Sequence, residues 1–373
     1  MRSNFLGYRG SKPFAFALFG LFALSQVGIT ESANAQTKPL QKVRMVVATG
    51  VLDVTYTEFT IPSILGYWKA EGYDVDVQPA GGSLQGAQQL VGGGAEIAVG
   101  SGNAFVSVAA KTNVPLRIAM TLRTSDWGVG VKDDGPIKSA KDLKGKTIGV
   151  FNLATGGILW LNELLQLNGF DPAKDVSLVP TGMGPTPVQA LQAGRVDGLL
   201  YWGSALASFE NAGLKMREIA GDDWASYPDY SVAVTQPMAD KDPAMIIAVL
   251  RGIAKAATFV AANPACAIKL HWAAYPASKG PGDEALVLKN DMHSVERAVA
   301  AMDQAMKSFG QGKLRGVFDK AAWEHLIKFM VKTNQLDAAV STDTVAVRIP
   351  DLVAKINDFD VKAIQDSAKA CKV

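Results

Sequence analysis

Apolar runs and amphipathic segments alternate along the first two thirds of the chain, and this alternation predicts most of the fold. Residues 43–48 form an apolar run of the length of a strand, and residues 59–68 carry apolar side chains at helical spacing. Residues 73–77 alternate polar and apolar side chains, as a strand with one buried face does. Strands that alternate with short helices predict a parallel α/β sheet whose binding loops follow the carboxyl ends of the strands.

The glycine-rich stretch over residues 80–104 is predicted to place two helix starts beside one cleft. Gly82 and Ser83 form a turn before an amphipathic helix, which ends at the glycines of residues 92–94. A short strand then leads to a second turn at residues 101–103, where another helix begins. The first N–H groups of a helix lack partners within it, so such turns can hold polar or anionic groups. The stretch therefore predicts half of a ligand-binding cleft.

A second unit with the same order of elements begins near Trp127. Strands are expected over residues 146–151, 176–179 and 196–200, with helices between them. The two units share a sequence of strand, glycine-rich turn, helix and strand, which is a weak internal repeat. Residues 231–235 are predicted to form a strand that returns to the first unit, and the chain after them is predicted to be helical.

The predicted fold class is α/β, with two lobes that each contain a mainly parallel sheet flanked by helices and with a helical C-terminal extension on the first lobe. One last helix is expected over residues 351–372. The predicted segments are residues 1–35 as a signal peptide, 36–126 as the first part of the first lobe, 127–230 as the second lobe, 231–340 as the return strand and helices of the first lobe, and 341–373 as a helical tail.

The first 35 residues have the composition of a secretory signal peptide. Three basic residues precede or border an apolar run over residues 13–25, and Ala33-Asn34-Ala35 is typical of a cleavage site. We therefore expect cleavage near Ala35 and a periplasmic location, and we expect no apolar run after Ala35 that is long enough to cross a bilayer.

The charge of the chain argues against a nucleic-acid partner. The chain has 37 basic and 35 acidic residues, and the predicted signal peptide holds three basic residues and one acidic residue, so 34 of each remain. A nucleic-acid-binding protein requires a basic surface, which this balance does not favour.

Cys266 and Cys371 are the only two cysteines in the sequence. An oxidising compartment would allow them to pair. Two cysteines 105 positions apart do not define a disulfide framework, and a buried thiol with a separate C-terminal thiol is the alternative. The sequence leaves both arrangements open.

Motifs for catalysis, metal binding and nucleotide binding fail on position or do not occur in the sequence. Residues 144–147 read Lys-Gly-Lys-Thr, but a phosphate-binding loop requires a glycine where Ala140 stands and a helix where a strand is predicted. His271, His293 and His325 lie in the helical C-terminal part without partners at metal-ligand or triad spacing. We therefore predict no catalytic residues, no metal and no cofactor.

The predicted binding residues follow strands or begin helices, and these positions share the edge of a sheet where a cleft forms. Hydroxyl and backbone N–H groups can hold a polar group, and aromatic side chains can wall an organic body. Helix capping and core packing are the competing explanations for these residue types. The candidates are Asp53, Thr55, Tyr56, Gly82, Ser83, Ser101, Asn103, Thr124, Asp126 and Trp127 in or near the first lobe, and Thr155, Gly156, Met183 and Trp202 in the second lobe.

Six short motifs follow one another over roughly residues 43–262. The motifs are Val43–Ala48, Gly66–Val75, Gly81–Ser83, Gly94–Ala98, Leu143–Val150 and Ala193–Gly198. In this order they resemble the substrate-binding proteins of ABC importers of the nitrate, sulfonate and taurine type, whose relatives bind pyrimidine precursors of thiamine. The resemblance implies a type II periplasmic binding protein fold, in which two lobes joined by two crossover strands close on a ligand. It also implies delivery of the ligand to a membrane permease with a cytoplasmic ATPase. We expect a monomer that is not an enzyme.

The resemblance does not specify the ligand. Asp53 and Asp126 stand among the candidates together with Arg123, which argues against an inorganic anion such as nitrate. The aromatic candidates favour a small organic molecule, namely a sulfonate, an aromatic carboxylate or an amino-pyrimidine.

Two other functions stay open at this point. An enzyme of pyrimidine-precursor synthesis can share the fold, but its relatives carry a cysteine-rich motif and an active-site histidine that do not occur in the first 265 residues. A ligand-sensing subunit of a membrane receptor would have the same sequence features.

Overall fold

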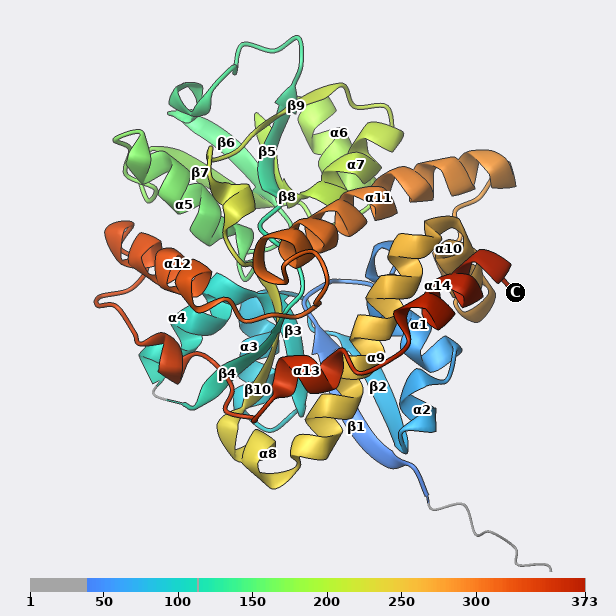
Figure 1. Ribbon diagram of the computed structural model, residues 1–373. Coiled ribbons are helices and arrows are strands. Elements are labelled where there is room, and N and C mark those ends of the chain that lie inside the picture. Colours follow the sequence, from blue (N-terminus) through green and yellow to red (C-terminus); the bar gives the residue numbers. More distant parts are fainter. Residues whose placement is uncertain (1–38, 113, 373) are drawn as a thin grey trace, which may run out of the picture. The chain divides into compact units, whose positions relative to one another are not determined.

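The structure, a computed structural model, describes residues 39–112 and 114–372, and this part of the chain is built around two five-stranded sheets (Figure 1). The predicted signal peptide lies outside the described residues. We call the part around the first sheet the first lobe and the part around the second sheet the second lobe. The strands of the first sheet, in spatial order, are β2 (Tyr73–Pro79), β1 (Gln41–Val47), β3 (Ile97–Ser101), β10 (Tyr230–Thr235) and β4 (Leu116–Thr121). Those of the second sheet are β7 (Val176–Pro180), β6 (Lys146–Val150), β8 (Gly198–Trp202), β5 (Trp127–Lys132) and β9 (Met216–Ile219).

Each sheet is mixed, because one strand runs against its neighbours. β1 pairs in parallel with β2 and β3, and β6 pairs in parallel with β7 and β8. β10 is antiparallel to β3 and β4, and β5 is antiparallel to β8 and β9. The antiparallel strands are the two that the chain enters when it crosses from one sheet to the other. The predicted two-lobed α/β fold is therefore confirmed, with one antiparallel strand inserted in each sheet.

Helices pack around both sheets. Those of the first lobe are α1 (Thr57–Ile64), α2 (Tyr67–Ala70), α3 (Ser83–Val91), α4 (Gly102–Thr112), α8 (Gln236–Lys241), α9 (Pro243–Ala262) and α10 (Pro264–Ala274). Those of the second lobe are α5 (Gly157–Leu167), α6 (Pro185–Gln192) and α7 (Gly203–Asn211). The C-terminal helices are α11 (Glu284–Phe309), α12 (Lys320–Lys332), α13 (Leu352–Ile356) and α14 (Val361–Ala370). Short 3-10 helices include η1 (Val54–Tyr56), η2 (Ala140–Leu143), η3 (Trp224–Ser226), η4 (Pro276–Ser278) and η5 (Thr342–Thr344).

Alternate residues of β1 pack on opposite faces of the first sheet, which is why its sequence forms a strand. Val43, Met45 and Val47 belong to the apolar core that includes α9, whereas Val46 belongs to the core that includes α3 and α4. Successive side chains of a strand point to opposite faces, so a continuous apolar run is buried when helices cover both.

Helix α9 is a core helix of the first lobe. Among the described helices it is the one long and apolar enough to cross a membrane, so the expectation that no run after Ala35 has this length and composition is wrong. Most of α9 is buried, and the indole N–H of Trp68 donates to the Val249 carbonyl at 3.0 Å. A helix that packs on a sheet needs the same apolar composition as one that packs in lipid.

Two crossover segments join the lobes and pair with each other. Residues 122–126 lead from β4 to β5, and residues 220–229 lead from β9 to β10. The N–H of Ser125 donates to the Tyr227 carbonyl, and the N–H of Asp229 donates to the Arg123 carbonyl, both at 3.0 Å. The hinge region is therefore a short antiparallel ladder.

Helices α11 and α12 contact both lobes (Figure 1). For α12, the contact with the second lobe is made by Phe329, whose ring centre lies 5.8 Å from that of Trp160 in α5. The Asn211 side chain of α7 donates to the Asn290 carbonyl of α11 at 2.7 Å, and α11 also contacts α9 and α10. On α12, the Trp323 indole donates to Thr121 of β4 at 3.1 Å. The assignment of residues 231–340 to the first lobe stays a prediction. Helix α11, which belongs to these residues, also makes extensive contact with the second lobe.

The C-terminal tail contains two helices, so the prediction of one helix over residues 351–372 is wrong. After α13, the Asn357 side chain accepts from the Arg315 N–H at 3.0 Å and donates to its carbonyl at 2.9 Å. The Asp360 carboxylate then accepts from the first turn of α14. Side chains that bond to nearby backbone groups compete with helix continuation, which explains the break.

A disulfide between Cys266 and Cys371 fastens the end of the chain to α10, with the two Cα atoms 5.6 Å apart. This bond decides between the two arrangements that the sequence left open. α14 thereby lies against α9, and Ala368 is buried there.

Replacing Cys371 by serine is expected to lower the free energy of unfolding by about 2 kcal/mol, because losing a cross-link between distant positions increases the freedom of the unfolded chain. Urea unfolding measures this difference, and the reduced wild-type protein should match the variant. Ligand affinity should not change, since neither cysteine lines the cavity described below. A variant as stable as the oxidised wild type would contradict a stabilising role for the bond.

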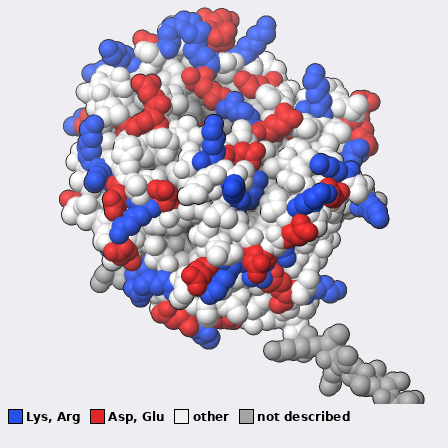
Figure 2. Space-filling model, viewed as in Figure 1, with Lys and Arg blue, Asp and Glu red and all other residues white. Residues whose placement is uncertain are grey.

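Charges of both signs are interspersed on the face that Figure 2 shows. Several form exposed ion pairs, including Arg217 with Asp133 at 2.8 Å and Lys174 with Asp171 at 2.7 Å. A mixed surface of this kind is not the basic stripe that nucleic-acid binding requires.

Candidate functional site

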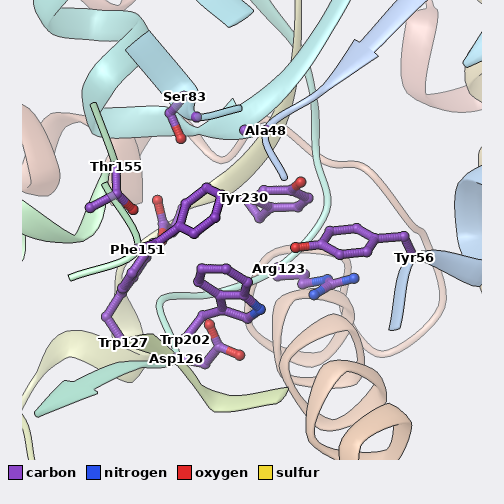
Figure 3. A pocket seen from close by; sticks show the side chains of 12 residues that line it. Ala48, Tyr56, Ser83, Arg123, Asp126, Trp127, Phe151, Thr155, Trp202 and Tyr230 are labelled. Carbon is purple, nitrogen blue, oxygen red and sulfur yellow. The ribbon is translucent and has the colours of Figure 1, made fainter. Parts of the chain in front are cut away.

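A cavity lies between the two lobes at the ladder formed by the crossover segments (Figure 3). It contains about 450 Å³ of space not filled by atoms, including its solvent-open mouth. Small-molecule sites typically combine an apolar wall with a few polar groups, as this cavity does. The residues that line it are Ala48, Tyr56, Gly82, Ser83, Arg123, Asp126, Trp127, Phe151, Thr155, Trp202, Asp229 and Tyr230.

Asp229 is a buried carboxylate that connects the lobes through hydrogen bonds. It accepts from the Ser101 hydroxyl and from the Gly102 N–H of the first lobe, the latter at 3.2 Å, and from the Trp127 indole of the second lobe at 2.8 Å. Burial raises the pKa of Asp229 to about 7, and the neighbouring Asp126 adds to this effect. The donors oppose the shift but do not cancel it.

The ligand-free protein is expected to lose stability as pH rises from about 4 to 7 through the titration of Asp229. Its folded pKa of about 7 exceeds the ordinary 3.8, so the native state holds a proton that the unfolded chain releases first. In Asp229→Asn this contribution is gone. The stability of the wild type relative to the variant should fall by more than about 1.4 kcal/mol between pH 5 and pH 8, which urea unfolding measures. A difference independent of pH would contradict the raised pKa.

Asp126 is the second carboxylate in the wall. It accepts from the Gly203 N–H at the start of α7 at 3.2 Å. Burial raises the pKa of Asp126, and the positive charges of Arg123 and Arg297 act in the opposite direction. Arg297 is itself paired with Glu218 at 2.8 Å.

Arg123 contributes a positive charge that is already neutralised. Its guanidinium forms a buried ion pair with Glu58 and donates to the Thr55 carbonyl at 3.1 Å. It also stacks over the ring of Tyr230, 5.1 Å from the ring centre. Among the described residues, neither Arg123 Nε nor the Tyr230 hydroxyl has a hydrogen-bond partner. Buried polar groups are normally satisfied, and both residues line the cavity.

Five aromatic side chains form the apolar part of the wall. Trp127 and Trp202 meet edge to face with ring centres 5.5 Å apart, and Phe151 meets Trp202 in the same way at 6.0 Å. Tyr56 lies 6.5 Å from Tyr230 on the other side (Figure 3). Edge-to-face packing holds the rings in fixed orientations, which gives the cavity a defined shape.

The lobes touch each other directly above the cavity. The Asn152 side chain donates to the Gly81 carbonyl at 2.7 Å, and the Leu84 N–H in the first turn of α3 donates to the Ala154 carbonyl at 3.4 Å. Gly156 packs so tightly on Ser101 that a Cβ there would lie 2.8 Å from the serine Oγ. These contacts define a closed arrangement of the lobes.

The structure brings seven of the fourteen predicted site residues into the cavity wall and places the others nearby. The seven are Tyr56, Gly82, Ser83, Asp126, Trp127, Thr155 and Trp202. Asp53 caps η1 by accepting from Thr55, and Ser101 donates to Asp229. Asn103 is buried in α4, and Thr124 lies in the crossover ladder. Gly156 forms the lobe contact, and Met183 packs on the apolar cluster of the second lobe that Phe151 and Trp202 also contact. All fourteen stay predictions as ligand contacts.

Five residues of the wall were not among the candidates, although Arg123 was noted beside Asp126: Ala48, Arg123, Phe151, Asp229 and Tyr230. Arg123, Asp229 and Tyr230 belong to the crossover ladder or the start of β10. The available signal for this group was the position of the charged Asp229 directly before the strand that returns to the first lobe. Ala48 and Phe151 directly follow β1 and β6, where binding residues are expected in an α/β fold.

Solved structures with the same two-lobed arrangement identify the class of fold. A protein from Bordetella bronchiseptica RB50 has a TM-score of 0.65 and 22% identity, over 85% of this chain and 97% of its own. The alkanesulfonate-binding protein SsuA from Xanthomonas axonopodis pv. citri, bound to MOPS, has a TM-score of 0.57 and 13% identity, over 83% and 100%. The periplasmic nitrate-binding protein NrtA from Synechocystis PCC 6803 has a TM-score of 0.56 and 12% identity, over 89% of each chain. The fold is that of type II periplasmic binding proteins.

Residues 55–267 match the family described as NMT1/THI5 like. This match spans more than half of the chain, and the chain belongs to the NMT1/THI5-like family. No curated protein gives a significant sequence match.

Proposed function

We propose that this chain is the periplasmic solute-binding component of an ABC-type importer. It captures a small organic ligand between its two lobes and delivers it to a membrane permease that is driven by a cytoplasmic ATPase. The observation that carries the proposal is the cavity at the hinge, where aromatic walls surround the unpartnered Arg123 Nε and Tyr230 hydroxyl. A ligand that contacts both lobes and the ladder between them favours the closed arrangement, which a permease can recognise.

Binding fits the wall of the cavity better than catalysis does. The wall holds no histidine, cysteine or lysine among the described residues. His271 is buried in α10 and bonded to Thr60, away from the cavity. No group of three potential metal ligands occurs in residues 39–112 and 114–372. The carboxylates of Asp126 and Asp229 are held by N–H donors, which suits recognition of a ligand.

Native mass spectrometry of protein purified without unfolding tests this function. We expect one small molecule to be retained and released unchanged on denaturation. Added back to ligand-free, refolded protein, it should raise the melting temperature, since 100 times its Kd stabilises the native state by about 2.7 kcal/mol. Chemical conversion of the molecule within a single turnover would instead support an enzyme. Retention of no molecule, together with no stabiliser in a broad screen of solutes, would contradict the proposal.

A further inference from the structure

Two carboxylates in the cavity wall have no cationic partner in the part of the chain that the structure describes. No Lys, Arg or His nitrogen there lies within 4.0 Å of an oxygen of Asp126 or Asp229. The nearby cations are already committed, Arg123 to Glu58 and Arg297 to Glu218. An anionic ligand would lie beside two buried carboxylates, of which Asp126 is only partly offset by the charges of Arg123 and Arg297, in surroundings of low dielectric constant.

We infer that the ligand of this cavity is a small organic cation, whose positive nitrogen is balanced by Asp126 and Asp229 and whose body lies against the aromatic wall. This inference rests on the proposed function and names its ligand class. Figure 3 shows the rings of Tyr56, Trp202 and Tyr230 around one space, with the Asp126 carboxylate at its edge. The face of an aromatic ring attracts a cation, most strongly for tryptophan and most strongly when water is excluded.

Part of the α3 N-terminus, which lies at the cavity wall, is already in use. The N-terminus of a helix binds anions through its free N–H groups. In α3 the Leu84 N–H donates to the Ala154 carbonyl of the other lobe, at 3.4 Å. The Ser83 Oγ accepts from the Ser101 N–H at 3.0 Å. The Leu84 N–H therefore serves the contact between the lobes, and the Ser83 hydroxyl oxygen is engaged within the first lobe.

The unpartnered donors specify a second feature of the ligand. The Arg123 residue is 4% exposed, and its Nε can only donate a hydrogen bond. The Tyr230 hydroxyl can donate as well. Arg123 Nε needs an acceptor and the Tyr230 hydroxyl can use one, whereas the two carboxylates favour a positive charge. The ligand class that fits is a nitrogen cation that also carries a hydroxyl, ether or carbonyl oxygen.

The protonation of Asp229 is consistent with this ligand class. In the ligand-free cavity, burial and the charge of Asp126 raise the pKa of Asp229 to about 7. A cation in the cavity would compensate both carboxylates and favour their ionised forms.

Binding of matched compounds to ligand-free, refolded protein tests the inference. Each of two sets consists of a cation, a neutral alcohol and a carboxylate with similar apolar bodies. The first set is choline, 3,3-dimethylbutan-1-ol and 3,3-dimethylbutanoate. The second set is benzylammonium, benzyl alcohol and benzoate. Titration calorimetry should give at least about tenfold tighter binding for a cation than for its neutral counterpart, and the weakest binding for the anion. Tighter binding of an anion would overturn the inference and leave the proposed function intact.

If none of the six compounds binds, the charge of the molecule retained in native mass spectrometry decides. A retained cation supports the inference, and a retained neutral molecule or anion overturns it. No retained molecule and no binding would contradict the proposed function itself, so the two failures are distinguishable.

Charge-neutral variants separate recognition from structure. Asp126→Asn keeps an acceptor for the Gly203 N–H and is expected to weaken binding of the cation at least about tenfold, with less than about threefold change for the neutral counterpart. Asp229→Asn should show the same selectivity and serves as a second variant if the first does not fold. Asp291→Asn is the control, because Asp291 is a half-buried carboxylate that accepts from the Trp272 indole outside the cavity. An equal loss for cation and neutral compound would contradict the inference.

Discussion

Replacing Glu58 by glutamine is expected to lower the free energy of unfolding by about 3–5 kcal/mol, because it leaves the buried guanidinium of Arg123 without a counter-charge. The two side chains are 1% and 4% exposed, so water cannot take over the role of the lost carboxylate. Arg123 also donates to the Thr55 carbonyl and stacks on Tyr230, which prevents it from turning toward solvent. Urea unfolding at neutral pH measures the loss.

An exposed ion pair of the same lobe provides the control for Glu58. Arg44 and Glu96 join β1 to the start of β3, and the arginine side chain is 52% exposed. Glu96→Gln is expected to cost no more than about 1 kcal/mol, because solvent screens the remaining charge. The double variant Glu58→Gln/Arg123→Met should recover part of the stability lost in Glu58→Gln, since it removes the uncompensated charge. Equal losses for Glu58→Gln and Glu96→Gln would show that burial does not govern the cost.

The two-lobed fold could be predicted from the sequence because it depends on local patterns. The apolar run of β1, the alternation of β2 and the glycine stops around α3 each act over a few residues. The exposed face of α3 holds Gln85, Gln88 and Gln89, as expected for the amphipathic helix predicted there. The direction of β10 and β5 was not predictable in the same way, because strand pairing depends on contacts between distant segments.

The site was only partly predictable, for the same physical reason. Residues after strands could be assigned to a cleft, but not the partner that each side chain takes there. Ser101 ends β3 directly before α4, yet its hydroxyl donates to Asp229, which is 128 positions further along the chain. Arg123 and Asp229 meet because two crossover segments pair, and nothing in their local sequence specifies that pairing. The Cys266–Cys371 bond likewise depends on tertiary contact over 105 positions.

Replacing Gly156 by alanine is expected to weaken ligand binding by about 100-fold or more, because a side chain at this position prevents the lobes from closing. The added Cβ would lie 2.8 Å from Ser101 Oγ, closer still to Ser101 Cβ, and 3.2 Å from Ser83 Oγ. Ser83 and Ser101 are buried and joined by a hydrogen bond, so neither can move aside without disturbing α3 or β3. Overpacking between fixed groups costs about 1–3 kcal/mol or more, and opening the lobes relieves it.

The backbone of Gly156 suits alanine, with φ −63° and ψ −23°, so the variant tests space between the lobes and not backbone strain. Each lobe should therefore stay folded, and the far-ultraviolet circular dichroism spectrum should not change. Small-angle X-ray scattering should show a larger radius of gyration for the variant than for the wild type in the presence of ligand, because closure is blocked. Gly86→Ala within α3 is the matched control, since its Cβ would meet the nearest atom at 3.7 Å and a helix favours alanine over glycine. If Gly156→Ala binds the ligand as tightly as Gly86→Ala does, the contact between Gly156 and Ser101 does not limit closure of the lobes. The ligand would then be bound with the lobes further apart than in this structure.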